Sequence, residues 1–251
     1  MLSPPLRSLP AALFLFAIAA PAQAEFKIES PIVEYRELEV ENAGSIGRDS
    51  RSAHDHEVSL VQEFAYGVSE RWATEFEAEW GHDPGPGNGL RYLVNTWANK
   101  YQVFEQGSQW LELGLWGEYG RATEVGGADR VKLGPLLQKV IGPTITTLNV
   151  FVEREVGPGA SHTLDSSYGL QVIYDWSKAL SPAIEAFGDM GDVQHLPRFN
   201  DQQHRLGPVL VGTYSLGELG AIKYNIAYLR GLTAATPQST YKWVMEYELA
   251  F

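Results

Sequence analysis

Carboxylates and large apolar residues alternate along several stretches of the chain. In RWATEFEAEW, Glu75, Glu77 and Glu79 occupy every second position, and Trp72, Phe76 and Trp80 occupy positions of the alternate series. Because successive side chains of a β-strand point to opposite faces, the carboxylates share one face and the aromatic residues share the other. Grouped carboxylates must either pair with cations or remain in water, so the surrounding strands decide their chemistry.

Histidines offer a second kind of chemistry. His54 and His56 flank Asp55, and two imidazoles on one face of a strand end could bind a divalent metal ion, although no third ligand is specified. Exposed loop histidines are the simpler interpretation, and we expect no cofactor. A lipid hydrolase would need a serine beside a histidine on the lipid side. Ser161 and His162 are neighbours that point apart, so we expect no enzymatic activity.

The composition points to an exported protein. The 251 residues carry a formal net charge of −12 and no cysteine, which argues against a nucleic-acid partner and a disulfide framework. The apolar run AALFLFAIAA followed by AQA predicts a signal peptide over residues 1–24, cleaved after Ala24. Its one charged residue is Arg7, so cleavage changes the formal net charge to −13. Residues 25–251 would then form the mature domain.

Period-two alternation recurs along the mature chain and predicts an all-β fold. No comparable pattern repeats at helical spacing. The expected strands are approximately 31–41, 55–68, 71–80, 90–105, 109–120, 129–141, 144–156, 166–177, 180–191, 203–215, 219–230 and 240–251.

The connections between these strands alternate in length, with six long and five short. Bacterial transmembrane barrels have this rhythm, with short periplasmic turns, longer extracellular loops and an even number of strands. The sequence therefore predicts a closed antiparallel transmembrane β-barrel of about 12 strands, with both termini in the periplasm. A soluble β-sandwich is the alternative.

The C-terminal strand YKWVMEYELAF carries an alternating apolar stripe. This stripe resembles the C-terminal signature of Gram-negative outer-membrane proteins, which ends in Phe, and the resemblance implies insertion by the barrel assembly machinery. The expected partners are then outer-membrane lipid and this machinery, and the expected location is the bacterial outer membrane. The stripe consists of Tyr241, Trp243, Met245, Tyr247, Leu249 and Phe251.

Such a barrel is apolar outside and polar inside. The charged residues of the strands should then line a net acidic lumen, where they either pair into a plug or line a water-filled channel. The candidate lumen residues are Glu75, Glu77, Glu79, Lys132, Glu153, Glu155, Arg205, Lys223, Lys242, Glu246 and Glu248.

Two local features concern the shape of the wall. KLGPLL at 132–137 matches RLGPVL at 205–210, and each proline suggests a bulge that could aim Lys132 and Arg205 inward. A duplicated substrate contact is the alternative. In LRYLVNTWANKYQVF the alternation slips near Asn99, which indicates a bulge or another register.

Several stretches resemble a group of largely uncharacterised proteobacterial outer-membrane barrels of the transporter type. They are PIVEYRELEVENAG, HEVSLVQEFAYGVSERWATEFEAEWG, KLGPLLQKVIG, TLNVFVEREVG, QHRLGPVLVG and YLRGLT, which span nearly the whole mature chain. The chain is also similar to the barrels linked with aromatic-compound degradation. This resemblance implies uptake of small molecules across the outer membrane.

The leading functional hypothesis is a passive outer-membrane channel or transporter for small solutes through a polar, net acidic lumen. The alternative is a closed barrel with a structural or binding role through its outer loops, with a metal ion as one ligand. A membrane-embedded hydrolase is the third hypothesis.

Overall fold

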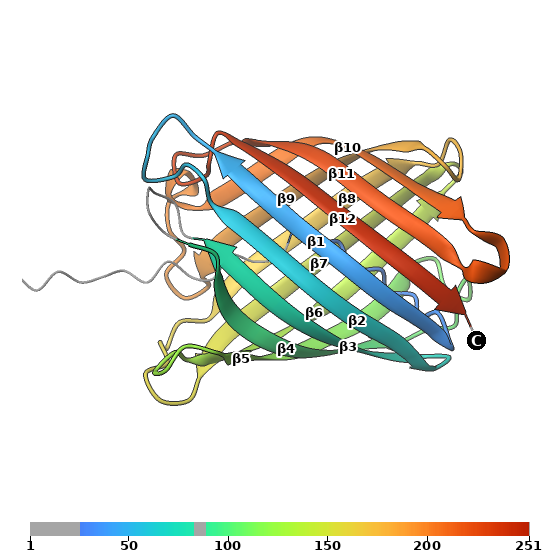
Figure 1. Ribbon diagram of the computed structural model, residues 1–251, viewed down its shortest axis with the longest axis horizontal. Coiled ribbons are helices and arrows are strands. Elements are labelled where there is room, and N and C mark those ends of the chain that lie inside the picture. Colours follow the sequence, from blue (N-terminus) through green and yellow to red (C-terminus); the bar gives the residue numbers. More distant parts are fainter. Residues whose placement is uncertain (1–25, 83–88, 251) are drawn as a thin grey trace, which may run out of the picture.

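The computed structural model describes residues 26–82 and 89–250, without the side chain of Ala250. The predicted signal peptide and Phe251 lie outside the described residues. Twelve antiparallel strands form one closed barrel in which sequence neighbours pair and β1 closes on β12, so the predicted fold is confirmed (Figure 1). No helix in the described part of the chain is long and apolar enough to cross a membrane. The strands are β1 Glu37–Arg48, β2 Val58–Ser69, β3 Trp72–His82, β4 Arg91–Gln102, β5 Glu112–Ala122, β6 Asp129–Ile141, β7 Thr144–Val156, β8 Asp165–Tyr174, β9 Ser181–Asp192, β10 Gln203–Ser215, β11 Ala221–Gly231 and β12 Ser239–Ala250.

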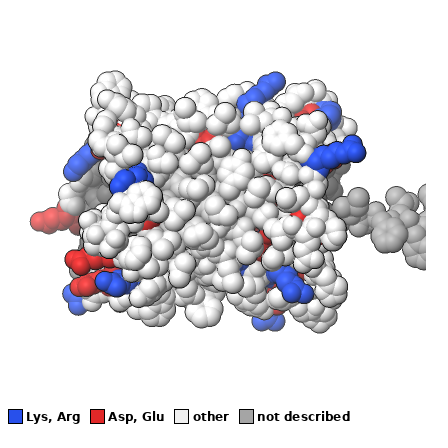
Figure 2. All heavy atoms as spheres, turned by 180° about the vertical axis from the view of Figure 1, so that it is seen from behind, with Lys and Arg blue, Asp and Glu red and all other residues white. Residues whose placement is uncertain are grey.

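The outer face of the barrel is apolar. Phe64, Phe76, Trp97, Leu115 and Ile226 are each about half exposed on this face. In Figure 2 the charged side chains gather at the two ends of the barrel, and a mostly uncharged band lies between them. The alternation of the sequence therefore places the apolar side chains where a transmembrane barrel contacts lipid. Closure of the barrel pairs the backbone groups of all strands, so that no unpaired sheet edge remains.

The two ends of the barrel differ in their connections. At the long-loop end, the strands are joined through 49–57, 83–90, 123–128, 157–164, 193–202 and 232–238. At the short-turn end, the connections are 70–71, 103–111, 142–143, 175–180 and 216–220. The predicted rhythm is weaker at two connections of the short-turn end. The connection 103–111 is longer than the expected turn at QGS because β4 already ends at Gln102 and β5 begins only at Glu112, and 175–180 has as many residues as 123–128 at the long-loop end.

The first strand begins later than predicted. We expected a strand from 31 to 41, but β1 spans Glu37–Arg48, and the segment before it lies inside the barrel. Pro31 has no backbone N–H to donate to a ladder, which disfavours a central strand at that position. Arg36 has a left-handed φ of 63° and donates its N–H to Gly67 O at 2.9 Å. This turn leads the chain out of the lumen and into β1.

The irregular pairing of β4 also differs from the prediction. The register between β3 and β4 shifts between Glu79 and Trp80, where Leu93 is the extra residue. Inward burial then alternates regularly from Val94 to Gln102. The slip expected near Asn99 therefore lies at the long-loop end of the strand.

The two Gly-Pro repeats do not produce bulges. The register of β6 with β7 and of β10 with β11 is the same on both sides of each repeat. Instead, each glycine permits a close approach of the neighbouring backbone. A Cβ added at Gly134 would lie 1.9 Å from Val150 O, and one at Gly207 would lie 1.9 Å from Tyr228 O. The repeats therefore bring adjacent strands together rather than inserting a residue.

Candidate functional site in the barrel lumen

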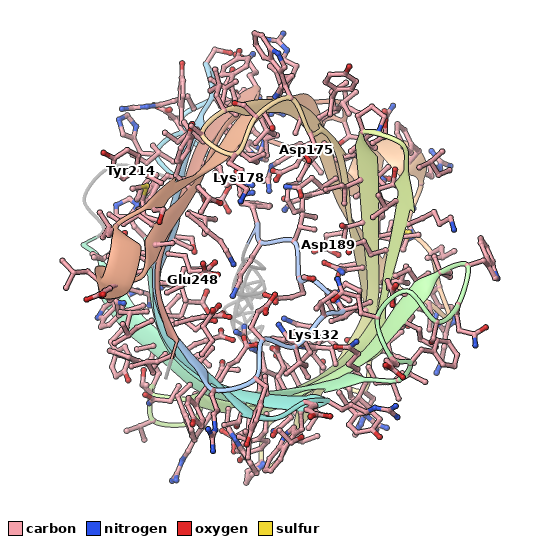
Figure 3. All side chains as sticks on the ribbon, turned by 90° about the vertical axis from the view of Figure 1, so that its right-hand side faces the viewer. Lys132, Asp175, Lys178, Asp189, Tyr214 and Glu248 are labelled. Atoms are coloured by element: carbon pink, nitrogen blue, oxygen red, sulfur yellow. The ribbon has the colours of Figure 1, made fainter. Side chains whose placement is uncertain are left out.

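Residues Phe26–Arg36 form a segment that enters the barrel, which we call the N-terminal lumen segment. Figure 3 looks into the barrel from the short-turn end and shows this pale blue trace crossing the interior. Glu29 N donates to Asn149 Oδ1 at 2.7 Å, and Asn149 Nδ2 donates back to Glu29 O at 2.8 Å. Val33 N donates to Gln102 Oε1 at 2.9 Å. The wall thus supplies partners to a backbone that belongs to no strand.

Glycines in the wall make room for this segment. A Cβ added at Gly67 would lie 1.9 Å from Glu34 O, and one at Gly114 would lie 3.0 Å from Pro31 Cα. At Gly169 the added atom would meet Ile28 Cδ1 at 2.7 Å. Three strands therefore carry a glycine where the segment passes, so larger residues there would displace it.

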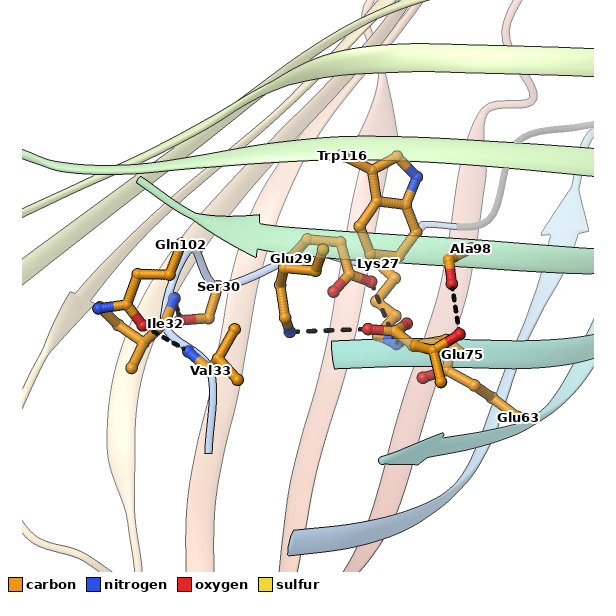
Figure 4. A network of polar contacts seen from close by, with 12 residues as sticks. Lys27, Glu29, Ser30, Ile32, Val33, Glu63, Glu75, Ala98, Gln102 and Trp116 are labelled. Carbon is orange, nitrogen blue, oxygen red and sulfur yellow. Dashed lines mark hydrogen bonds and ion pairs between the residues drawn. The ribbon is translucent and has the colours of Figure 1, made fainter. Parts of the chain in front are cut away.

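Lys27 is the charged centre of the segment (Figure 4). Its Nζ lies 3.1 Å from Glu29 Oε1, 3.5 Å from Glu41 Oε2, 2.6 Å from Glu63 Oε2 and 3.9 Å from Glu75 Oε2. The side chains of Glu63 and Glu75 are almost completely buried. One ammonium group is therefore shared by four carboxylates, three of which come from β1, β2 and β3.

A second group of charges belongs entirely to the wall. Arg130 pairs with Glu79 at 2.9 Å, and Lys132 pairs with Glu118 at 2.9 Å. Trp116 Nε1 also donates to Glu118 Oε2 at 2.9 Å. Lys132 lies 5.6 Å from the centroid of the Phe151 ring. These residues lie on β3, β5, β6 and β7, so the cations and carboxylates are all held by strands.

A third group centres on Glu185, whose side chain is fully buried. Lys242 Nζ donates to Glu185 Oε2 at 2.7 Å, while Gln171 and Asn225 donate to Oε1 at 2.6 and 2.7 Å. Both carboxylate oxygens thus accept hydrogen bonds, as a buried charge requires.

The remaining sequence candidates lie in four places. Arg205 is buried, 3.8 Å from Glu57 and 4.2 Å from the Phe26 ring centroid. Lys223 contacts Glu246 and Glu248 near the short-turn end. Glu155 is exposed at the long-loop end and accepts a hydrogen bond from Ser161 N at 2.7 Å. Glu77 and Glu153 are partly buried on the inner face.

Apolar side chains also occupy the interior. Phe187, Val209 and Leu229 form a buried cluster against which Phe26 and Ile28 pack. Trp116 and Leu136 are buried in another cluster. The inner face is therefore more apolar than a simple inside-polar pattern predicts, partly because the lumen segment needs a surface to pack on.

Lys27 lines two cavities. The larger, about 530 Å³, includes Asp175 and Lys178 of the short-turn end and reaches Lys27 and Lys242. The smaller, about 60 Å³, is lined by Lys27, Lys132 and Arg205, among other residues. The two Gly-Pro repeats thus bring Lys132 and Arg205 to one cavity. Figure 3 shows Asp175 and Lys178 together at the rim.

The histidine pair is not arranged as expected. Positions 52–56 form turns rather than a strand end, because β2 begins at Val58. One nitrogen of His56 lies against Asp55 at 2.6 Å and the other contacts Arg48. Among the described residues, the groups whose possible ligand atoms lie within 4.8 Å of one another are Glu37, Glu39 and Glu248, and Glu63, Glu75 and Glu77. Neither includes His54 or His56.

The terminal stripe follows the outer face of β12. Tyr241, Met245 and Tyr247 are exposed, while Trp243 and Leu249 are partly buried. Trp243 lies over Gly44 of β1, where a Cβ would meet its ring at 2.3 Å, and its Nε1 donates to Asn42 Oδ1 at 3.1 Å. The stripe therefore also packs at the seam that closes the barrel.

The lumen segment is the part of the candidate site that the strand pattern did not reveal. A detectable signal was present, because Lys27, Glu29 and Pro31 lie between the predicted cleavage site and the first regular alternation. Two charges and a proline are unusual at the start of a membrane strand. Only the structure shows that Lys27 meets Glu41, Glu63 and Glu75.

No family model matches the chain, and no curated protein matches it either. Among solved structures, it is similar to the NanC porin, with a TM-score of 0.55, 11% identity, 85% of this chain covered and 100% of that chain. It is also similar to the translocator domain of the autotransporter NalP from Neisseria meningitidis, with a TM-score of 0.50, 12% identity and coverages of 86% and 88%. At these identities the similarity concerns the fold, which is that of bacterial outer-membrane barrels.

Proposed function

We propose that the protein is a non-enzymatic outer-membrane channel that lets small solutes diffuse through a polar, net acidic lumen. In this proposal the signal peptide is removed after Ala24, and the barrel assembly machinery inserts the mature chain into the outer membrane. The N-terminal lumen segment narrows the path. The porin fold of one structural neighbour and the family resemblance support this interpretation.

The main support for a channel is the cavity of about 530 Å³ that extends from residues of the short-turn end to Lys27. This volume is within the range of about 300–1,000 Å³ that small-molecule sites occupy. Charged and amide groups such as Lys223, Asn225 and Glu246 line it beside apolar groups such as Ile173 and Val211. A solute entering here would reach Lys27, which also lines the smaller cavity.

The direct test is the single-channel conductance of the refolded mature chain in a planar bilayer, with the reversal potential measured across a KCl gradient. We expect discrete steps and a cation preference, because carboxylates surround the middle of the lumen. A chain that inserts and folds but stays silent under all voltages and salts would overturn the channel proposal. A lipid or ester turnover assay on the same preparation tests the hydrolase hypothesis separately.

A further inference from the structure

Glu63 and Glu75 are two buried carboxylates that face the same point in the lumen. Each residue is only 1% exposed. Buried carboxylates repel one another and require a nearby cation or proton. Two cations meet this need: Lys100 of β4, 3.6 Å from Glu75, and Lys27, which arrives on a segment outside the sheet and is also shared with Glu29 and Glu41. The strands therefore contribute more carboxylates than lysines here, and the ammonium group of Lys27 lies among these carboxylates.

The carboxylates have the spacing of a metal site. One oxygen from each of Glu63, Glu75 and Glu77 lies within 4.8 Å of the others. A calcium ion has oxygen ligands at about 2.3–2.6 Å, so two of its ligands lie at most roughly 5 Å apart. Oxygen ligands without nitrogen or sulfur favour hard ions such as Ca²⁺, Mg²⁺ and Mn²⁺.

A second observation concerns Glu75. Its Oε2 is buried and accepts no hydrogen bond from the described residues. The ammonium group of Lys27 is 3.9 Å from this oxygen, beyond hydrogen-bonding distance, and Lys100 lies 3.6 Å from the other oxygen. A buried carboxylate oxygen that accepts no hydrogen bond, on a residue of this carboxylate group, is available to bond a metal ion.

Lys27 and a metal ion would exclude each other. Lys27 Nζ lies 2.6 Å from Glu63 Oε2, so an ion bound by the carboxylate of Glu63 would lie beside the ammonium group. An ion bonded to that oxygen would place two like charges only a few ångströms apart, which is strongly repulsive in the interior. Binding of the ion would therefore release Lys27 and weaken the seating of the N-terminal lumen segment.

We propose that Glu63, Glu75 and Glu77 form a binding site for a divalent hard cation, and that Lys27 is a tethered competitor for this site. If the barrel is a channel, a cation arriving through the lumen would exchange with Lys27 and loosen the constriction that the lumen segment forms. Only this effect on the channel rests on the proposed function. The binding site itself does not require that the barrel conducts.

The test is a titration of the folded mature chain with Mn²⁺ in detergent micelles, followed by the electron paramagnetic resonance signal of the free ion. We expect Lys27→Met to bind one Mn²⁺ per chain at least roughly tenfold more tightly than the wild type, a change of about 1.4 kcal/mol. Adding Glu63→Gln and Glu75→Gln to Lys27→Met should abolish this binding. Lys132→Met is the matched control, since it removes another inward lysine beside a glutamate and should create no tight site.

A second measurement follows the segment itself. Saturating Mn²⁺ should accelerate hydrogen exchange of the Val33 amide in the wild type, because release of Lys27 loosens the bond from Val33 N to Gln102. The proposal is overturned if folded Lys27→Met binds Mn²⁺ no better than Lys132→Met, or if the two glutamine substitutions leave its binding intact. Lys27→Gln replaces Lys27→Met if the latter does not refold. Because binding is measured in micelles, a silent bilayer experiment would overturn the channel and leave the site standing.

Discussion

The Lys27 and Lys242 clusters are two ways of placing a lysine among buried carboxylates. Lys242 is on β12 and pairs with Glu185 of β9, whose two oxygens are both hydrogen-bonded. Lys27 is on the N-terminal lumen segment and is shared by four carboxylates, at distances from 2.6 to 3.9 Å. The first cation is fixed by the sheet, and the second can leave without breaking a strand. Similar chemistry therefore joins two strands of the wall in one place and holds a segment outside the sheet in the other.

Breaking the wall-borne pair should have the largest effect on stability. Lys242→Met leaves the carboxylate of Glu185 buried without its cation, which costs about 3–5 kcal/mol in the free energy of unfolding. Urea unfolding of the barrel in liposomes, followed by tryptophan fluorescence, measures this loss. Lys242→Met combined with Glu185→Leu should recover most of it, because a well-packed apolar pair can replace a buried ion pair. Wild-type stability for the single variant would contradict the assignment.

Removing the cation of the lumen segment should cost less. Lys27→Met removes hydrogen bonds to charged groups, a loss of about 1.5–3 kcal/mol. Lys100 remains 3.6 Å from Glu75, and the segment can shift because it belongs to no strand. The same unfolding experiment should place its loss below that of Lys242→Met. The comparison between the clusters fails if Lys27→Met is the more destabilising of the two.

Replacing a wall glycine that contacts the N-terminal lumen segment should displace this segment while leaving the barrel folded. Gly67→Ala puts a methyl group against Glu34 O, a backbone atom that can move only with the segment. We expect faster hydrogen exchange at the amides of Glu29 and Val33, with little change in the strand amides. Gly89→Ala is the matched control, because a Cβ there meets nothing within 4 Å. Equal hydrogen exchange in both variants would show that the position of the segment does not depend on a glycine at position 67.

The smallest expected effect lies outside the membrane-spanning strands. Arg51 donates to Asp49, and hydrogen bonding from its guanidinium holds the pKa of this carboxyl well below its ordinary value. Asp49 also accepts from Gln238 N at 3.0 Å, linking two long loops. A depressed pKa stabilises the loops above the ordinary aspartate pKa of about 3.9, and this contribution is lost as the pH falls toward the folded-state value.

An NMR titration of the Gln238 amide in nanodiscs measures this link. Its chemical shift should remain constant down to below about pH 3.9 in the wild type and should titrate at higher pH in Arg51→Gln. Identical titrations in the two proteins would exclude Arg51 as the cause.

Most of the barrel was predictable because period-two alternation and loop rhythm are local signals. They place Glu75 and Trp72 on opposite faces, as the burial of the two residues shows. The start of β1 was wrong because apolar residues of the lumen segment, such as Ile32 and Val33, imitate a strand in sequence. The cluster around Lys27 depends on contacts between residues up to 48 positions apart, as for Lys27 and Glu75, and no local pattern encodes these.

The most direct test of the central claim, that the N-terminal lumen segment lies against the inner wall, is a disulfide trap. The chain has no cysteine, and a Cβ at Gly114 would lie 3.1 Å from Pro31 Cβ, close to disulfide geometry. Folded Pro31→Cys/Gly114→Cys should form an intramolecular disulfide under mild oxidation, detected by mass spectrometry. Pro31→Cys with Ser166→Cys, at the long-loop end, should not. Failure of the first pair, or equal cross-linking of both, would contradict the placement of the segment.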